Sequence, residues 1–386
     1  MNRRMFLTSA AAAAASGSAG STLPKSLGRH ITRPLAITMW DFSWLERRWP
    51  GAGYEDWDEA LDELKRRGYD AVRIDAYPHL VAADPDKTWE LLPEWSVQDW
   101  GAPARCRVRI QPALNEFIAK CADRGICVGL STWFRQDVDN QRLKIASPAD
   151  LGALWKKTLD SVAAAGLIDA LLYVDLCNEW PLSVWAPFLP KGHRRATPDG
   201  ARWMREPIAM LRESYPQLAY TFSFTSEYDK WREEDVSMHD FLELHLWMTH
   251  FSDFYKQVGY NYERFDAKGY DNMQLKSEAL YRSKPEHWKA ALAKGVDFCA
   301  EWSRASGKPL ITTECWSIVD YKDWPMLSWE WPKELCELGV RRASASGRWA
   351  AIATSNFCGP QFKGMWRDVA WHQRLTRVIH EGKLPA

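Results

Sequence analysis

Leu172-Tyr-Val-Asp-Leu-Cys-Asn178-Glu179-Trp180 begins as a short apolar run of strand length. It ends in an amide, a carboxylate and an indole, three groups for which a buried strand has no structural use. A strand that passes through a core and presents a carboxylate at its C-terminal tip is typical of an active-site strand in an α/β barrel. The stretch therefore predicts that Glu179 lies at the mouth of a barrel.

A second stretch of the same kind follows later in the chain. In Pro309-Leu-Ile-Thr-Thr-Glu314-Cys-Trp316 an apolar, β-branched run again ends in a glutamate followed closely by tryptophan. Two carboxylates at strand tips are the groups that glycoside hydrolysis requires. The pair Glu179 and Glu314 is therefore the strongest functional signal in the sequence.

The rest of the chain alternates strand-like and helix-like segments around these two stretches. We predict strands at 35–39, 70–75, 126–132, from 172, at 219–224, 242–247, from 309 and at 349–354. We predict helices at 54–67, 112–124, 148–165, 198–215, 285–305 and about 366–380. Ser147 is the expected N-cap of the helix at 148–165.

Eight strands alternating mostly with helices predict an α/β fold, a single (β/α)₈ TIM barrel over residues 25–386 with long, aromatic-rich loops. The helix between the fifth and sixth strands is the weakest assignment, and two long connections are expected, one reaching about residue 110 and one at 249–275. A doubly wound open sheet is the alternative, but no Gly-x-Gly-x-x-Gly turn follows the first strand.

Charge and tryptophan content narrow the class of ligand. Lys+Arg and Asp+Glu are both 50, which gives no indication of nucleic acid or of an anionic membrane surface as a partner. An indole packs well on a sugar ring while its N–H bonds a hydroxyl. The 23 tryptophans therefore favour a sugar cleft, since most follow predicted strands: Trp40, Trp44, Trp49, Trp89, Trp95, Trp100, Trp133, Trp180, Trp185, Trp231, Trp247, Trp316, Trp324, Trp329, Trp331 and Trp366.

The first residues read as an export signal that is later removed. Arg3-Arg4 precede a short alanine-rich run and a small-residue exit, and the arginine pair resembles a twin-arginine signal. We assign residues 1–24 to this signal and predict a periplasmic or secreted protein with no membrane attachment after its removal. Eight cysteines include no Cys-x-x-Cys, and most are expected to be small buried hydrophobes rather than disulfide or metal partners.

The strand tips resemble those of the large clan of retaining (β/α)₈ glycoside hydrolases that includes the cellulase-like families. In that clan the fourth strand ends in Asn-Glu and the seventh in a nucleophilic Glu, which Asn178-Glu179 and Glu314 match. Arg73 resembles the arginine of strand two that lies under the nucleophile. His245-Leu-Trp247 resembles the strand-six His-x-Tyr, with Trp in place of Tyr.

The resemblance implies a retaining enzyme that cleaves β-linked glycosides or polysaccharides, with Glu179 as acid/base and Glu314 as nucleophile. Strand three ends in Trp133 where many cellulases carry histidine, and strand eight ends in Asn356-Phe357 where the clan usually has Trp. These departures leave the sugar open. The predicted substrate-binding residues are Arg73, Tyr77, His79, Trp133, Asn178, Trp180, His245, Trp247 and Trp316.

The two glutamates need different protonation states. Glu314 must be ionised to attack, and Arg73 beneath it would lower its pKa. Glu179 must start protonated, so burial and the charge of Glu314 are expected to raise its pKa. Arg73 could instead pair with Asp41 or Asp75, and His245 could be a core histidine or a group that orients Glu179.

Three other functions use the same fold. A carbohydrate-binding barrel without catalysis would need neither glutamate, and a transglycosylase would use both. A metal-dependent hydrolase would need a His/Asp cluster at the strand tips, which Asp41 alone does not supply. We therefore expect a carbohydrate substrate, no metal and no organic cofactor.

Overall fold

The computed structural model describes residues 23–96, 98–261, 267–323 and 327–385. The predicted export signal lies almost entirely in residues 1–22, outside the described residues, as do Trp324 and part of the predicted 249–275 connection. None of the helices within the described ranges has the length and the apolar character that a membrane span requires.

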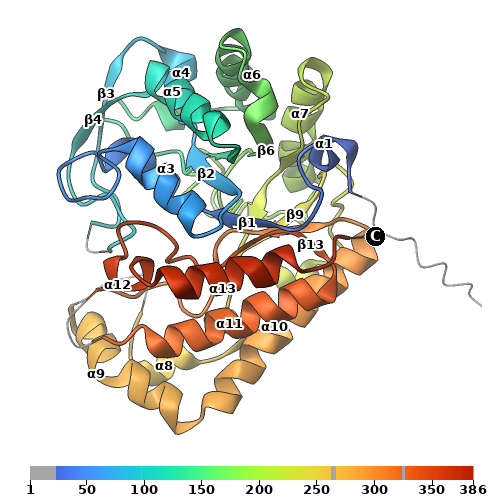
Figure 1. Ribbon diagram of the computed structural model, residues 1–386. Helices are drawn as coiled ribbons and strands as arrows, with labels where there is room; N and C mark the ends of the chain where they lie inside the picture. Colours follow the sequence, from blue (N-terminus) through green and yellow to red (C-terminus); the bar gives the residue numbers. More distant parts are fainter. Residues whose placement is uncertain (1–22, 97, 262–266, 324–326, 386) are drawn as a thin grey trace, which may run out of the picture.

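A parallel sheet forms the centre of the molecule (Figure 1). Its order is β7-β6-β5-β2-β1-β13-β11-β9-β8, formed by β1 (Leu35–Thr38), β2 (Ala71–Asp75), β5 (Cys127–Ser131), β6 (Leu171–Asp175), β7 (Tyr220–Thr221), β8 (Ser223–Phe224), β9 (Leu242–Leu244), β11 (Leu310–Thr312) and β13 (Trp349–Ala353). Phe222 alone separates β7 from β8, so the first and last members of the sheet are two halves of one strand. The sheet therefore closes into the predicted α/β barrel.

Every residue of the barrel strands except Cys127 is buried, as expected for parallel strands covered by helices. The covering helices are α3 (Trp57–Arg66), α5 (Ile110–Asp123), α6 (Pro148–Ala164), α7 (Pro198–Ser214), α10 (Pro285–Ser306), α11 (Glu330–Ser346) and α13 (Val369–His380). Ser147 caps α6 as expected, because its side chain accepts a hydrogen bond from the amide of Asp150. Figure 1 shows α10, α11 and α13 lying side by side against one part of the barrel.

The long connections contain more structure than the sequence indicated. The first holds α4 (Pro78–Ala83) and an antiparallel hairpin of β3 (Thr88–Leu91) and β4 (Cys106–Arg109). The second holds α8 (Phe254–Val258) and the first part of α9 (Ala267–Ser283), a helix that the sequence analysis did not predict. The short elements α1 (Lys25–Gly28), α2 (Ser43–Glu46) and α12 (Lys363–Trp366) complete the helices described.

Two strands continue past a break at the mouth of the barrel. β10 (Leu246–Trp247) follows β9 after His245, and β12 (Cys315–Trp316) follows β11 after Thr313 and Glu314. β10 and β12 pair in parallel with each other. Between β8 and β9 the described chain has a 3₁₀ turn at Tyr228–Lys230 and no α-helix, which is where the sequence pattern was weakest.

All eight cysteines are free, and six of them are buried. Most of the cysteines are therefore small buried hydrophobes, as the sequence analysis predicted.

Candidate active site

Glu179 and Glu314 meet at the C-terminal ends of the barrel strands. Glu179 follows β6 in a turn with φ 47°, and this turn is held by hydrogen bonds from the Glu179 amide to Ser223 Oγ (2.9 Å) and from the Trp180 amide to the Ser223 carbonyl (2.9 Å). Glu314 lies in the break between β11 and β12. One oxygen of each glutamate and a ring nitrogen of His245 all lie within 4.8 Å of one another.

Arg73 lies beneath Glu314 and is completely buried. Its guanidinium donates to Glu314 Oε1 (2.6 Å), Asn178 Oδ1 (3.0 Å), Asp41 Oδ1 (2.9 Å) and Glu243 Oε1 (2.8 Å). Arg73 therefore pairs with Asp41 and supports Glu314 at the same time. The planar guanidinium of Arg73 on β2 therefore connects Asn178 after β6, Glu243 on β9 and Glu314 after β11.

His245 lies between the two glutamates. Its Nδ1 is 3.0 Å from Glu179 Oε1 and 3.6 Å from Glu314 Oε2, and its Nε2 is 3.2 Å from an Arg73 nitrogen. Burial alone would lower the pKa of His245, but the carboxylates of Glu314, Glu179 and Glu243 raise it to about 10. The Nδ1–H of His245 therefore donates to Glu179 while its Nε2 faces the donor of Arg73, so His245 is not an isolated core histidine.

The pKa values of the glutamates have the reverse of the expected order. Burial raises the pKa of Glu314 to about 7, although His245 and Arg73 both oppose the rise. Burial would also raise the pKa of Glu179, but the hydrogen bond and charge of His245 and the bond from Trp185 lower it. Because the two carboxyl groups interact, a proton bound here belongs to the pair rather than to one residue.

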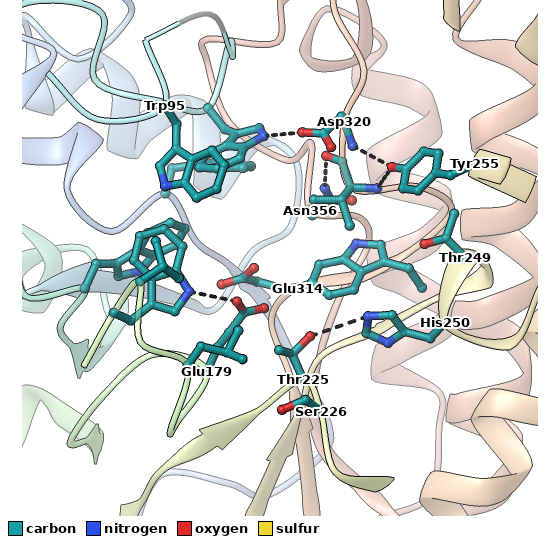
Figure 2. A pocket seen from close by; sticks show the side chains of 18 residues that line it. Trp95, Glu179, Thr225, Ser226, Thr249, His250, Tyr255, Glu314, Asp320 and Asn356 are labelled. Atoms are coloured by element: carbon teal, nitrogen blue, oxygen red, sulfur yellow. Dashed lines mark hydrogen bonds between the residues drawn. The ribbon is translucent and has the colours of Figure 1, made fainter. Parts of the chain in front are cut away.

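Tryptophan is the commonest residue in the wall of the cavity above the glutamates (Figure 2). The cavity measures about 250 Å³ and is lined by Trp40, Trp95, Trp100, Trp133, Glu179, Leu182, Val184, Trp185, Thr225, Ser226, Trp247, Thr249, His250, Tyr255, Glu314, Val319, Asp320 and Asn356. The predicted binding residues Trp133 and Trp247 are among them. A concave site with many indoles and few convergent polar groups suits a sugar ring.

Trp180 and Trp316 do not line this cavity. Both are fully buried: Trp180 packs against Phe222 with ring centroids 4.9 Å apart, and Trp316 donates from Nε1 to the Ala353 carbonyl (2.9 Å). The expectation that they stack on sugar is therefore a misassignment. Their side chains turn into the helix layer because successive residues at a strand end point to opposite faces.

Tyr77 and His79 are also structural. The Tyr77 hydroxyl donates to Glu46 Oε1 (2.9 Å), and His79 Nε2 lies 3.0 Å from the Arg135 carbonyl. Both side chains are buried and neither lines the cavity. They support the loops that follow β2 instead of contacting a ligand there.

Trp185 has a role that the sequence did not single out. Its Nε1 donates to Glu179 Oε2 (2.8 Å), so the two oxygens of Glu179 are held by Trp185 and His245. The nearest signal in the sequence was the general enrichment of tryptophan after predicted strands. Nothing in the local pattern distinguished Trp185 from Trp180, since both follow the same strand.

The cluster of Glu179, His245 and Glu314 does not suit a metal ion. Glu179, His245 and Glu314 each offer a ligand atom, but His245 carries a proton on the nitrogen that faces the glutamates, and Arg73 already binds Glu314. A histidine must be deprotonated at the nitrogen that binds a metal. The donor set therefore fits proton transfer between carboxyl groups better than metal binding.

The variants Trp316→Ala and Trp185→Phe should show which indoles stabilise the fold and which act in the cavity. Trp316→Ala removes a fully buried side chain, which typically costs about 3–5 kcal/mol, and should lower the melting temperature strongly. Trp185→Phe keeps an aromatic wall but loses the donor to Glu179, so it should change the pH profile with a smaller effect on melting. Calorimetry and kinetics of both variants check this, and the opposite pattern would return Trp316 to the ligand site.

Comparisons with known proteins agree with this geometry. A structure from Parabacteroides distasonis, provisionally assigned as a glycoside hydrolase, is 50% identical, covers 91% of this chain and 95% of its own, and superposes with a TM-score of 0.89. Two distant structures share the fold: GH5_18 from Streptomyces cattleya in complex with GlcNAc (15% identity, 92% of this chain and 82% of that one, TM-score 0.51) and an endo-β-1,4-mannanase from Thermotoga petrophila (11% identity, 92% and 78%, TM-score 0.52).

No curated protein matches the chain significantly. The family model described as sugar-binding cellulase-like matches residues 37–380, from within β1 to the end of α13. With a barrel of parallel strands, two glutamates at its mouth and a cavity walled by tryptophan, the chain belongs to the cellulase-like family of glycoside hydrolase folds.

Proposed function

We propose that the protein is a retaining glycoside hydrolase that cleaves β-linked glycosides, with Glu314 as nucleophile and Glu179 as general acid/base. The observation that carries the proposal is the separation of the two carboxyl groups, which approach within 4.8 Å. Retaining enzymes hold their carboxyl groups about 5–5.5 Å apart, whereas inverting enzymes need about 6.5–9.5 Å to admit a water molecule. Little room for such a water remains between Glu179 and Glu314.

In the first step the Glu314 carboxylate attacks the anomeric carbon, and Glu179 gives a proton to the departing glycosidic oxygen. In the second step Glu179 takes a proton from water, which displaces Glu314 and restores both groups. Asn178 supports this chemistry: its Oδ1 is held by Arg73, while its buried Nδ2 has no hydrogen-bond partner among the described residues. Asn178 is fully buried and is not among the residues that line the cavity, so its proposed bond to a sugar 2-hydroxyl requires the ligand to reach the floor of the site beside Arg73.

His245 provides a route by which the proton shared by the two glutamates can reach Glu179, the general acid. With one proton on the carboxyl pair, Glu314 binds it more tightly than Glu179. The proton must be on Glu179 for catalysis, and Nδ1 of His245 lies 3.0 Å from Glu179 Oε1 and 3.6 Å from Glu314 Oε2. Transfer of the Nδ1 proton to Glu179, with return of a proton from Glu314, delivers the reactive state without net change in charge.

Proton NMR of the sugar released in the first turnovers tests the mechanism. A β-glycoside should give the β-anomer before mutarotation, because two displacements restore the original configuration. Initial formation of the α-anomer would overturn the assignment of Glu314 as nucleophile. A product linked to a second sugar rather than to water would indicate the transglycosylase alternative, which uses the same two glutamates. A barrel without catalysis would give no product.

The pH profile of kcat/KM should be bell-shaped, because the reaction needs one proton on the pair. Above the upper pKa, which burial of Glu314 places at about 7, both carboxyl groups are ionised and no acid remains. Below the lower pKa both are protonated and no nucleophile remains. Activity should therefore fall as pH rises through about 7, and stopped assays from pH 4 to 9 would reveal it. A profile flat to pH 9 would contradict the shared proton.

We also infer export on the basis of Arg3-Arg4 and the alanine-rich run after them. Replacing both arginines with lysine should block export by the twin-arginine route and retain the protein inside the cell. Fractionation with an antibody against the barrel checks this, and unchanged secretion of the variant would exclude that route.

A further inference from the structure

Asp320 is a buried carboxylate in the cavity that the proposed chemistry does not use. The residue is 1% exposed, and the Tyr255 hydroxyl accepts hydrogen bonds from the amides of Val319 (2.9 Å) and Asp320 (3.0 Å). Asp320 Oδ1 accepts from Trp100 Nε1 (3.1 Å). The loop that carries Asp320 is therefore fixed at its backbone and at one carboxylate oxygen.

The other oxygen of this carboxylate has no partner. Asp320 Oδ2 and the side-chain oxygen of Asn356 make no hydrogen bond within the described residues, although both side chains line the cavity and Asn356 is only 2% exposed. The Nε1 groups of Trp40 and Trp247, also in the wall, have no partner there either. Buried acceptors and donors without partners cost free energy, and a bound ligand with hydroxyl groups would supply both kinds of partner.

The placement of Asp320 identifies the part of a ligand that it faces. Figure 2 shows Asp320 and Asn356 on one side of Glu314 and Glu179 on the other. A general acid lies next to the leaving group, so the side away from Glu179 receives the sugar that is transferred to Glu314. The unpartnered oxygens therefore face the transferred sugar and not the leaving group.

We propose that Asp320, together with Asn356, is the specificity-determining acceptor for ring hydroxyls of the transferred sugar, and that this sugar is uncharged. The proposal rests on the proposed function, since it uses Glu179 and Glu314 to orient the ligand. A uronic acid would place its carboxylate in a buried pocket that already holds the carboxyl groups of Asp320 and Glu314, and like charges repel strongly there.

The electrostatics of the pocket agree with this assignment. Burial raises the pKa of Asp320 to about 7, although the bond from Trp100, the neighbouring hydroxyl of Tyr260 and the charge of Lys322 all oppose the rise. A carboxyl group in this condition gains from each hydroxyl that donates to it. The carboxylate of an anionic sugar cannot donate to the free oxygen, and its charge opposes binding beside Asp320 and Glu314.

The test compares wild type, Asp320→Asn and Asp323→Asn on 4-nitrophenyl β-D-glycosides. The panel contains glucoside, galactoside, mannoside, xyloside, N-acetylglucosaminide, glucosaminide and glucuronide. Asp323 is the matched control, because its Oδ1 also accepts from an indole, Trp329 Nε1 (2.6 Å), but lies outside the cavity lining. Wild type should prefer a neutral sugar, and Asp320→Asn should lose about 10- to 100-fold in kcat/KM on it, the factor for one hydrogen bond to a charged group.

Deoxy substrates then distinguish recognition from structural support. Removing the 3-, 4- or 6-hydroxyl of the preferred sugar should slow wild type and Asp323→Asn at one position at least tenfold, whereas Asp320→Asn should lose little more at that position. Additive losses at every position, faster turnover of the glucuronide, a preference for the cationic glucosaminide that Asp320→Asn removes, or no turnover of any neutral sugar would each overturn the proposal. If Glu314→Ala abolishes turnover while Asp320→Asn matches wild type, only this inference fails. If Glu314→Ala remains active, the proposed function fails first.

Discussion

Glu314→Ala should reduce turnover by roughly 10⁴-fold or more while leaving the barrel folded. Glu314 is the carboxyl group of the cavity that Arg73 holds at 2.6 Å, and its loss removes the group that forms the glycosyl–enzyme bond in the proposed mechanism. Residual activity with an aryl glycoside should be rescued by azide. The product should be the α-glycosyl azide from a β-substrate, because the small anion attacks once in the space left by the carboxylate.

A 2-deoxy-2-fluoroglycoside with a good leaving group should label Glu314, and peptide mass spectrometry would locate the label. Glu243→Gln is the matched control: Glu243 is also a buried carboxylate on Arg73, at 2.8 Å, but it does not line the cavity. That variant should still be labelled at Glu314. Label on another residue, or a β-glycosyl azide from the Glu314→Ala variant, would require a different nucleophile.

Glu179→Ala should affect substrates according to their leaving groups. Glycosides with alcohol leaving groups need a proton and should slow by about 10²–10⁴-fold, whereas the first step with a dinitrophenyl glycoside needs none and should be nearly unchanged. The second step still lacks its base, so the glycosyl–enzyme should accumulate and give a burst of phenol. Equal losses on both classes of substrate would contradict the assignment.

The anomer of the glycosyl azide that forms should distinguish Glu179→Ala from Glu314→Ala. In Glu179→Ala azide should attack the glycosyl–enzyme and yield the β-glycosyl azide, the opposite anomer from the one expected for Glu314→Ala. Trp185→Phe is the matched control for this position, since it alters a partner of Glu179 and leaves the carboxyl group in place. It should show no azide rescue.

The strand tips were predictable because they combine two strong local signals. An apolar run that ends in a polar cluster is unusual within a core, and this pattern located Glu179 and Glu314 at the ends of barrel strands, whereas Arg73 within β2 was placed by its resemblance to the clan. Helix α9 was missed even though Tyr270, Met273, Ser277 and Tyr281 are buried at helical spacing. The many aromatics of its neighbourhood masked that period, because they also pack a loop.

The direction of each indole and the order of the pKa values could not be read from the chain. Trp180 and Trp185 follow the same strand, and only the turn between them sends one into the core and the other to Glu179. The pKa of Glu314 depends on burial and on His245, which reaches it from another strand. Charge interactions of this kind are set by distances in three dimensions and not by spacing in sequence.

The buried charges around Arg73 imply a conflict between heat resistance and turnover. Because the pKa of Glu314 is raised in the folded barrel, the barrel binds that proton more tightly than the unfolded chain does, and this contribution to stability is lost as pH rises toward 7. Glu314→Gln is neutral throughout, so its advantage in melting temperature over wild type should be larger at pH 8 than at pH 5. An equal advantage at both values would show that the charge carries no such cost. If the melting-temperature advantage of Glu314→Gln grows with pH as expected, directed evolution for thermal tolerance alone would replace Glu314 early. A library would retain Glu314 only if it were also selected for release of sugar.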